Sequence, residues 1–337
     1  MLEIFGTLGP ACSERDILER MFLEGMTGMR LNMSHSGLKE SEALIDNFHQ
    51  AARKAGVKPE LLIDMQGPEL RIGRLSQPLV LKESEEIRLV DQKEPTGDSL
   101  EIPVPDSVFP VLEAGDQILL DDGKMELAVT EVKPKVIAKV IRAGTLESRK
   151  SLKVVNKYIS GPAVTARDKE NIRLAKEYGV TSLMQPFVTR GEELIEVREA
   201  LQKNQVDHVR IFAKIENCQG MRNIEDIIPY ADMIVIARGD LGNDMPLWKL
   251  PVAQKELAEI CTERGRPFLV VTQMLASMVQ NPVPTRAEVS DIFHAVADGA
   301  KAVMVTNETA VGRYPVEVIR YLKRTAEEAA EWKKCTI

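Results

Sequence analysis

Short apolar segments alternate with helical segments along most of the chain, and this alternation limits the fold more than any other feature. The apolar segments span residues 2–8, 27–32, 60–64, 180–186, 210–214, 232–237, 267–272 and 301–305. They are rich in β-branched residues and lack polar alternation, which is typical of parallel strands buried on both faces. Eight strand–helix units predict an α/β protein with a TIM (β/α)8 barrel. An open doubly wound sheet is the alternative, but the chain has no G-x-G-x-x-G motif.

The alternation stops between residues 69 and 162. Short strands and turn signals follow one another there, and apolar and polar residues alternate, as is typical of a small antiparallel β-barrel. We therefore expect an inserted β-barrel domain of residues 69–162 after the third strand, with the (β/α)8 barrel formed by residues 1–68 and 163–337.

Charge and composition exclude several classes of protein. The net charge is −7 and the basic residues are dispersed, so no surface for nucleic acid is expected. No apolar run approaches the roughly 20 residues of a membrane span, and the N-terminus does not resemble a signal peptide, so we expect a cytoplasmic protein. The four cysteines are widely scattered, which favours neither a disulfide framework nor a zinc site.

Charged and hydroxyl side chains gather where the apolar segments end. Lys214 and Glu216 follow one segment, and Arg238 and Asp240 follow the next. Because barrel strands all end on one face, these groups are expected to converge there. Such a set can bind a divalent cation, a phosphate and a carboxylate, and can relay protons. The complete set is Arg30, Asn32, Ser34, Asp64, Lys214, Glu216, Arg238, Asp240, Thr272, Thr306 and Glu308.

At these residues the chain resembles the pyruvate kinase family. The matching motifs occur in order across nearly the whole chain, including the expected insertion. They are TLGP, RLNMSH, IDMQGPELR, DDG, ESRKS, KIENCQG, ARGDLG, VTQML, NPVPTRAEVSD and NETAVGRYP.

The resemblance implies transfer of a phosphoryl group from phosphoenolpyruvate to ADP, giving pyruvate and ATP. It implies that Glu216 and Asp240 bind Mg²⁺ or Mn²⁺, and that Lys214 and Arg30 hold the phosphoryl group. The backbone of Gly239 and Asp240 would bind the substrate carboxylate. Thr272 would orient that carboxylate and help to protonate the enolate. Thr306 and Glu308 would lie further along the same relay.

Further positions follow from the same resemblance. A K⁺ site would be formed by Asn32, Ser34, Asp64 and the main-chain carbonyl of Met65, and Glu69 fits the potassium-dependent branch of the family. The nucleotide would be bound by Asn32, His35, Arg71 and Arg167. The inserted domain would act as a lid, and the barrel region near residues 284–288 would form a homodimer contact. We also expect Trp248 and Trp332 to pack against neighbouring helices.

The chain departs from the family pattern at several places. Met65 and Gln66 stand where threonine and lysine are usual, Arg167 replaces a lysine, residues 154–156 replace a Leu-Pro-Gly hinge, and Asn307 replaces a glycine. The usual C-terminal effector domain does not follow the barrel, so a short form is expected. Two alternatives remain open: a paralogue that uses the same Mg²⁺–enolate site with another acceptor or for aldol-type chemistry, and a non-catalytic binding protein.

Overall fold

The computed structural model describes residues 2–34, 36–68, 70–93, 100–155, 157, 159 and 161–336. The chain divides into two compact units, Met1–Gly67 with Ala163–Ile337, and Pro68–Pro162. This division falls one residue from the boundary expected at residues 68 and 69.

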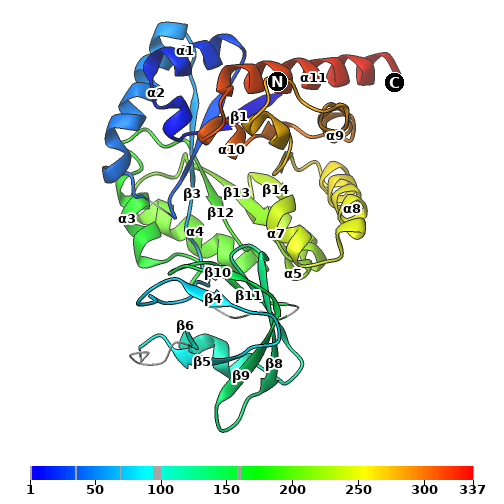
Figure 1. The fold of residues 1–337 in the computed structure, drawn as a ribbon. Helices are drawn as coiled ribbons and strands as arrows, with labels where there is room; N and C mark the ends of the chain where they lie inside the picture. Colours follow the sequence, from blue (N-terminus) through cyan, green and yellow to red (C-terminus); the bar gives the residue numbers. More distant parts are fainter. Residues whose placement is uncertain are drawn as a thin grey trace. The chain divides into compact units, whose positions relative to one another are not determined.

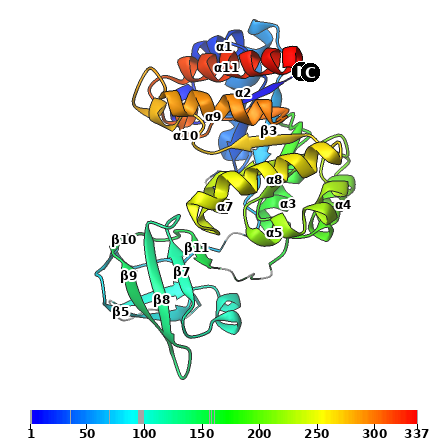
Figure 2. The ribbon, with the colours of Figure 1, turned by 90° about the vertical axis from the view of Figure 1, so that its right-hand side faces the viewer.

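In the described part of the first unit, eight parallel strands form a closed barrel in the order β1-β16-β15-β14-β13-β12-β3-β2. This confirms the predicted TIM barrel, and Figures 1 and 2 show it surrounded by helices. The strands are β1 Glu3–Thr7, β2 Gly28–Asn32, β3 Glu60–Asp64, β12 Ser182–Gln185, β13 Arg210–Ile215, β14 Met233–Ala237, β15 Phe268–Val271 and β16 Ala302–Met304.

Amphipathic helices cover the barrel. In α2, for example, Ile45, Phe48 and Ala52 recur at helical spacing on the buried face, and Gly56 ends the helix with a φ of 70°. The α-helices are α1 Arg15–Leu23, α2 Glu42–Ala55, α3 Ala166–Leu174, α4 Gly191–Lys203, α5 Cys218–Arg222, α6 Ile224–Ile227, α7 Arg238–Asn243, α8 Leu250–Glu263, α9 Arg286–Ala297, α10 Asn307–Ala310 and α11 Pro315–Thr336. Short 3-10 helices are η1 Pro10–Cys12, η2 Lys39–Ser41, η4 Ile228–Tyr230, η5 Leu247–Lys249 and η6 Ala276–Val279.

The barrel interior is a packed core. Phe5 of β1 meets Phe212 of β13 edge to face, with ring centroids 6.3 Å apart. Leu62, Met184, Val235 and other strand residues fill the rest of the interior. A larger apolar cluster lies between the strands and the helices. The functional side chains must therefore lie beyond this core, where the strands end.

At the opposite end of the barrel, Arg210 joins the starts of three strands. Its guanidinium lies 2.9 Å from Glu3 and 2.5 Å from Glu60, and its Cζ lies 4.8 Å from the Phe212 ring centroid. The group is half-buried, so both carboxylates depend on it for charge compensation.

Replacing Arg210 by methionine is expected to lower the free energy of unfolding by about 1–3 kcal/mol, because two carboxylates then lose a charged hydrogen-bond donor. Chemical denaturation measures the effect. The activity of each folded molecule should not change, since the substitution is at the far end of the barrel from the proposed site. Full stability in the variant would show that the Arg210 ion pairs are not needed to close the barrel.

The second unit contains two sheets in its described residues. The six-stranded sheet has the order β11-β7-β8-β9-β5-β6, and the other pairs β10 with β4. The expected small antiparallel barrel thus takes the form of two sheets, and one pair, β5–β6, is parallel. The elements are β4 Leu79–Leu81, β5 Glu86–Asp91, β6 Glu101–Val104, η3 Asp106–Val111, β7 Gln117–Leu120, β8 Met125–Glu131, β9 Val136–Arg142, β10 Gly144–Leu146 and β11 Leu152–Val154.

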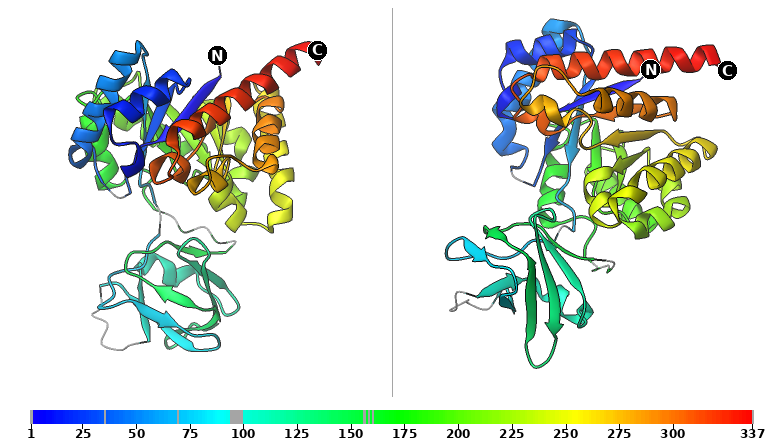
Figure 3. Two further views of the ribbon diagram at one scale, coloured as in Figure 1. Left: turned by 45° about the horizontal axis from the view of Figure 1, so that its top comes forward. Right: turned by 45° about the vertical axis from the view of Figure 1, so that its right-hand side comes forward.

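The two tryptophans behave differently. Trp332 of α11 packs on Phe293 of α9, with ring centroids 5.5 Å apart, and Figure 3 shows these helices side by side. Trp248 is 80% exposed, so the expectation that it packs against a helix is wrong. It belongs to η5, which precedes α8 and turns its side chains to solvent. None of the helices in the described part of the chain combines the length and the apolar character that crossing a bilayer requires.

Candidate active site

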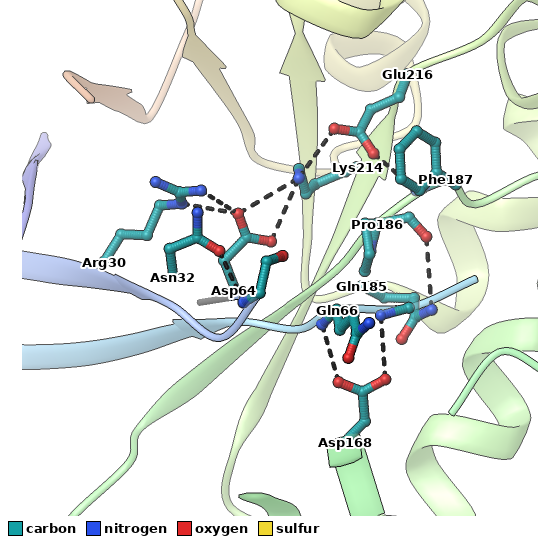
Figure 4. Close-up of polar contacts among 12 residues, drawn as sticks. Arg30, Asn32, Asp64, Gln66, Asp168, Gln185, Pro186, Phe187, Lys214 and Glu216 are labelled. Carbon is teal, nitrogen blue, oxygen red and sulfur yellow. Dashed lines mark hydrogen bonds and ion pairs between the residues drawn. The ribbon is translucent and has the colours of Figure 1, made fainter. Parts of the chain in front are cut away.

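Four charged side chains meet where β2, β3 and β13 end (Figure 4). The Asp64 carboxylate lies between two cations: Oδ2 accepts from Arg30 Nε at 2.7 Å, and Lys214 Nζ lies 3.3 Å from Oδ1. The same Lys214 ammonium lies 2.9 Å from Glu216 Oε1. The predicted convergence of Arg30, Asp64, Lys214 and Glu216 is therefore observed, and we call these four residues the charged cluster.

Burial disfavours the charged form of each group in the charged cluster, and the neighbouring opposite charges counteract this effect. Burial alone would raise the pKa of Asp64, but Lys214 and Arg30 outweigh it and hold that pKa below its ordinary value. Burial opposes the charge of Lys214 as well, yet Asp64 and Glu216 raise its pKa, so the ammonium stays protonated. Two cations and two carboxylates balance one another in a region from which water is largely excluded.

Glu216 is only 1% exposed, and within the charged cluster its ion pair is with Lys214. Its burial raises the pKa to about 7; Lys214 opposes the rise, and the nearby carboxylate of Asp240 adds to it. Its second oxygen, Oε2, accepts a hydrogen bond from the backbone N–H of Phe187 at 2.8 Å. Two carboxylates that repel each other beside a single lysine favour the binding of another positive charge.

This donor set fits a hard divalent cation. Within the described residues, no three His, Cys, Asp or Glu side chains gather closely enough to hold a metal by themselves. Two carboxylates are nevertheless a usual protein contribution to Mg²⁺, which keeps water and substrate oxygens as its other ligands. Glu216 and Asp240 therefore remain the predicted ligands.

A second group of residues lies at the ends of β14 and β15. Arg238 donates from Nε and Nη2 to the carbonyl of Thr272, at 3.2 and 2.6 Å, and pairs with Asp291 of α9 at 2.8 Å. Thr272 has a φ of 83°, which is unusual for a β-branched residue. A Cβ at Gly239 would lie 3.2 Å from Thr272 Cγ2, so a larger residue there would crowd the threonine. Arg238 thus holds Thr272 in a strained conformation.

Thr306 and Glu308 lie after β16. Glu308 is buried, and its Oε2 accepts from the backbone and the hydroxyl of Thr306 at 2.7 and 3.2 Å. Its Oε1 accepts from the backbone of Leu275 at 3.2 Å. The carboxylate therefore ties two strand-end loops together, and this geometry favours a positioning role for Glu308 over direct proton transfer.

The residues expected to bind K⁺ and nucleotide are only partly described. Asn32 Oδ1 accepts from the backbone of Ser34 at 3.0 Å, and Arg167 Nη1 reaches the Ser34 carbonyl at 3.5 Å. Arg71 belongs to the second unit, where it donates to the Arg149 carbonyl at 2.9 Å. His35, Glu69 and Asn156 lie outside the described residues. The Met65 backbone donates to the carbonyl of Met184 at 3.1 Å.

Two residues that the sequence pattern did not single out help to hold this end of the barrel together. Phe187, with a φ of 55°, donates its backbone N–H to Glu216. Asp168 is fully buried and accepts from the backbone of Gln66 and Gly67. A capping box with Thr165 was the available signal for Asp168, because an acid three residues after a threonine is typical of a helix start.

Glu288 offers a test of stability against pH. It accepts from the backbone and hydroxyl of Ser277, at 2.7 and 2.6 Å, and closes a capping box with Thr285. Burial alone would raise its pKa, but these donors hold it below the ordinary value of 4.5.

The Glu288 carboxylate therefore adds stability above pH 4.5, and this contribution is lost as the pH falls through the lower folded pKa. We expect Glu288→Gln to be less stable than the parent at pH 7 and to approach it at acidic pH. Urea unfolding at several pH values measures this, and a difference that grows on acidification would contradict it.

Comparison with known proteins gives a consistent result. A family model described as the pyruvate kinase barrel domain matches residues 1–319. Pyruvate kinase of Bacillus licheniformis is 37% identical over 339 residues, covering 98% of this chain and 58% of that protein. Those of Staphylococcus haemolyticus and Geobacillus stearothermophilus are 35% and 36% identical, with 98% of this chain covered. The chain covers 58% of the Staphylococcus haemolyticus protein and 57% of the Geobacillus stearothermophilus protein. It thus spans less than two thirds of the length of these relatives.

Proposed function

The chain belongs to the pyruvate kinase family, and from this premise we propose that it transfers the phosphoryl group of phosphoenolpyruvate to ADP, giving pyruvate and ATP. The observation that carries the proposal is the Lys214 ammonium, held 2.9 Å from Glu216 and 3.3 Å from Asp64 in a buried cluster. A fixed, permanently charged lysine suits a phosphoryl group better than it suits aldol cleavage.

In this proposal Lys214 and Arg30 neutralise the charge that spreads over the equatorial oxygens during transfer. Their positions are fixed beforehand by Asp64, which binds both, so little reorganisation is needed when the phosphoryl group moves. The ion pairs with Asp64 would loosen as the substrate oxygens compete for the same donors.

Glu216 and Asp240 would hold Mg²⁺ or Mn²⁺, which when bound supplies a positive charge for the enolate oxygen and the carboxylate. Backbone N–H groups of Gly239 and Asp240 would orient the substrate carboxylate. Thr272, held by Arg238, would direct a proton to the enolate carbon, and Thr306 would extend that relay with Glu308 as its support.

Asn32, Ser34, Asp64 and the carbonyl of Met65 would hold K⁺. Within the first unit, Asn32 and Arg167 would bind the nucleotide phosphates. Arg167 keeps the charge of the usual lysine but presents a planar group, so the preferred diphosphate is part of what must be measured.

The test is pyruvate release from phosphoenolpyruvate by purified protein with Mg²⁺ and K⁺, comparing ADP, other nucleoside diphosphates and no acceptor. We expect release with at least one diphosphate and none without. Phosphoenolpyruvate that still binds with Mg²⁺ while no diphosphate supports release would favour the alternative, a related enzyme with another acceptor or with aldol-type chemistry.

A further inference from the structure

One buried carboxylate binds two stretches of chain that are far apart in sequence. Asp168 is 0% exposed, and its Oδ1 accepts from the backbone of Gln66 at 2.9 Å, across 102 residues. Its Oδ2 accepts from the backbone of Gly67 at 3.1 Å, and from the backbone and hydroxyl of Thr165 at 3.1 and 2.6 Å. Four donors thus converge on one side chain, and Figure 4 shows the contact of Asp168 with Gln66.

These stretches are the places where the chain leaves the barrel and returns to it. The first unit breaks off after Gly67 and resumes at Ala163. Gln185, at the end of β12, supports the same region by donating from Nε2 to the Ala163 carbonyl at 2.8 Å. Gly67 has a φ of 57°, and a Cβ there would lie 2.4 Å from Pro186 Cγ, so the turn is held tightly against the barrel.

The same turn continues directly from the charged cluster. The Asp64 carbonyl accepts from the backbone of Met33 at 2.9 Å, and the next N–H, that of Met65, donates to Met184. Gln66 and Gly67 then donate to Asp168. The backbone of each of the four consecutive residues 64–67 therefore makes a hydrogen bond within the barrel unit. Asp168 is the acceptor of the last two of these bonds.

We propose that Asp168 is a positioning residue for the active site: by binding Gln66 and Gly67 it fixes Asp64 and the Met65 carbonyl where K⁺ and Lys214 require them. This inference rests on the proposed function, because that function assigns K⁺ to those two groups. The competing explanation is that Asp168 serves only as the capping acid of α3.

Two variants separate these explanations. Asp168→Asn keeps the shape of the side chain but turns one oxygen into a donor, so backbone donors of the turn lose an acceptor. Thr165→Ala removes the capping hydroxyl and leaves Asp168 with Gln66 and Gly67. Amide hydrogen exchange of the segment around residues 66 and 67 reports on the turn directly, and the K⁺ concentration for half-maximal pyruvate formation reports on the site.

We expect Asp168→Asn to lose protection of this segment and to raise the half-activating K⁺ concentration about tenfold, as supporting partners of metal ligands commonly do. Thr165→Ala should change neither. Equal effects of the two variants, or lost protection with unchanged K⁺ activation, would overturn the proposal.

A third variant displaces the turn directly and does not change Asp168. Gly67→Ala places a Cβ against Pro186 and leaves Asp168 intact, so it tests whether the position of the turn controls K⁺ activation if Asp168→Asn does not fold. Lost protection of the turn with unchanged K⁺ activation in this variant would overturn the proposal. If the parent protein transfers no phosphoryl group, the proposed function fails. In that case, thallium NMR measures binding at the K⁺ site in the parent and in Asp168→Asn, and hydrogen exchange measures protection of the turn in both. These two measurements decide separately whether Asp168 positions the site.

Discussion

Replacing Lys214 by methionine is expected to lower phosphoryl transfer about a thousandfold while divalent-cation binding persists. Within the charged cluster, Lys214 pairs with both carboxylates, 2.9 Å from Glu216 and 3.3 Å from Asp64. Methionine has a similar length but cannot donate to phosphoryl oxygens. The two carboxylates proposed to bind the cation, Glu216 and Asp240, are unchanged, so the loss should appear in kcat while the cation binds at least as tightly as in the parent.

The same substitution is expected to destabilise the cation-free protein by about 3–5 kcal/mol, because buried Glu216 then loses its ion pair with Lys214 and Asp64 keeps only its ion pair with Arg30. Added Mn²⁺ should restore more stability to the variant than to the parent, since it replaces the missing positive charge. Thermal unfolding with and without Mn²⁺ measures this.

Lys54→Met is a matched control. Lys54 also pairs with a glutamate, Glu19, but at the exposed surface of α2, where such pairs contribute little. It should match the parent in activity and in its response to Mn²⁺. A Lys214→Met protein that behaved like this control would remove Lys214 from the mechanism.

Glu216→Gln is expected to weaken Mn²⁺ binding by at least about a hundredfold, since Glu216 is proposed as a direct ligand and loss of a ligand costs no less than loss of its supporting partner. The amide keeps an acceptor for the Phe187 N–H, so the local backbone should be preserved. Calorimetric titration of Mn²⁺ into phosphoenolpyruvate-saturated protein measures the affinity, and activity should fall in parallel.

Glu60→Gln controls for the loss of a carboxylate. Glu60 is at the start of β3, where it pairs with Arg210 at the opposite end of the barrel. It should lose stability but keep Mn²⁺ affinity. Equal metal affinity in Glu216→Gln and the parent would show that the cation binds elsewhere.

The barrel could be predicted because its evidence is local and repeated. Each strand is a short apolar run, and each strand end carries its own polar residues, so the convergence of Arg30, Asp64, Lys214 and Glu216 followed once eight units had been counted. The direction of strand pairing in the second unit could not be read in this way. Apolar–polar alternation reveals a strand but not its neighbour, and β5 and β6 pair in parallel.

The contacts of Asp168 could not be predicted from the sequence, for a different reason. Its partners Gln66 and Gly67 lie about a hundred residues earlier, and nothing in the local sequence connects them. For Trp248 the local sequence led to a wrong prediction. An apolar residue beside a helix predicts packing, but the short η5 turns this side chain to solvent.

Phosphorus NMR of phosphoenolpyruvate, ADP, Mg²⁺, K⁺ and the protein tests the central claim most directly, because it follows the transferred atom itself. We predict that the phosphoenolpyruvate resonance declines as the γ-phosphate resonance of ATP grows in equal amount, and that neither changes with Lys214→Met. An unchanged spectrum, release of inorganic phosphate alone, or equal transfer by the variant would contradict phosphoryl transfer at the charged cluster.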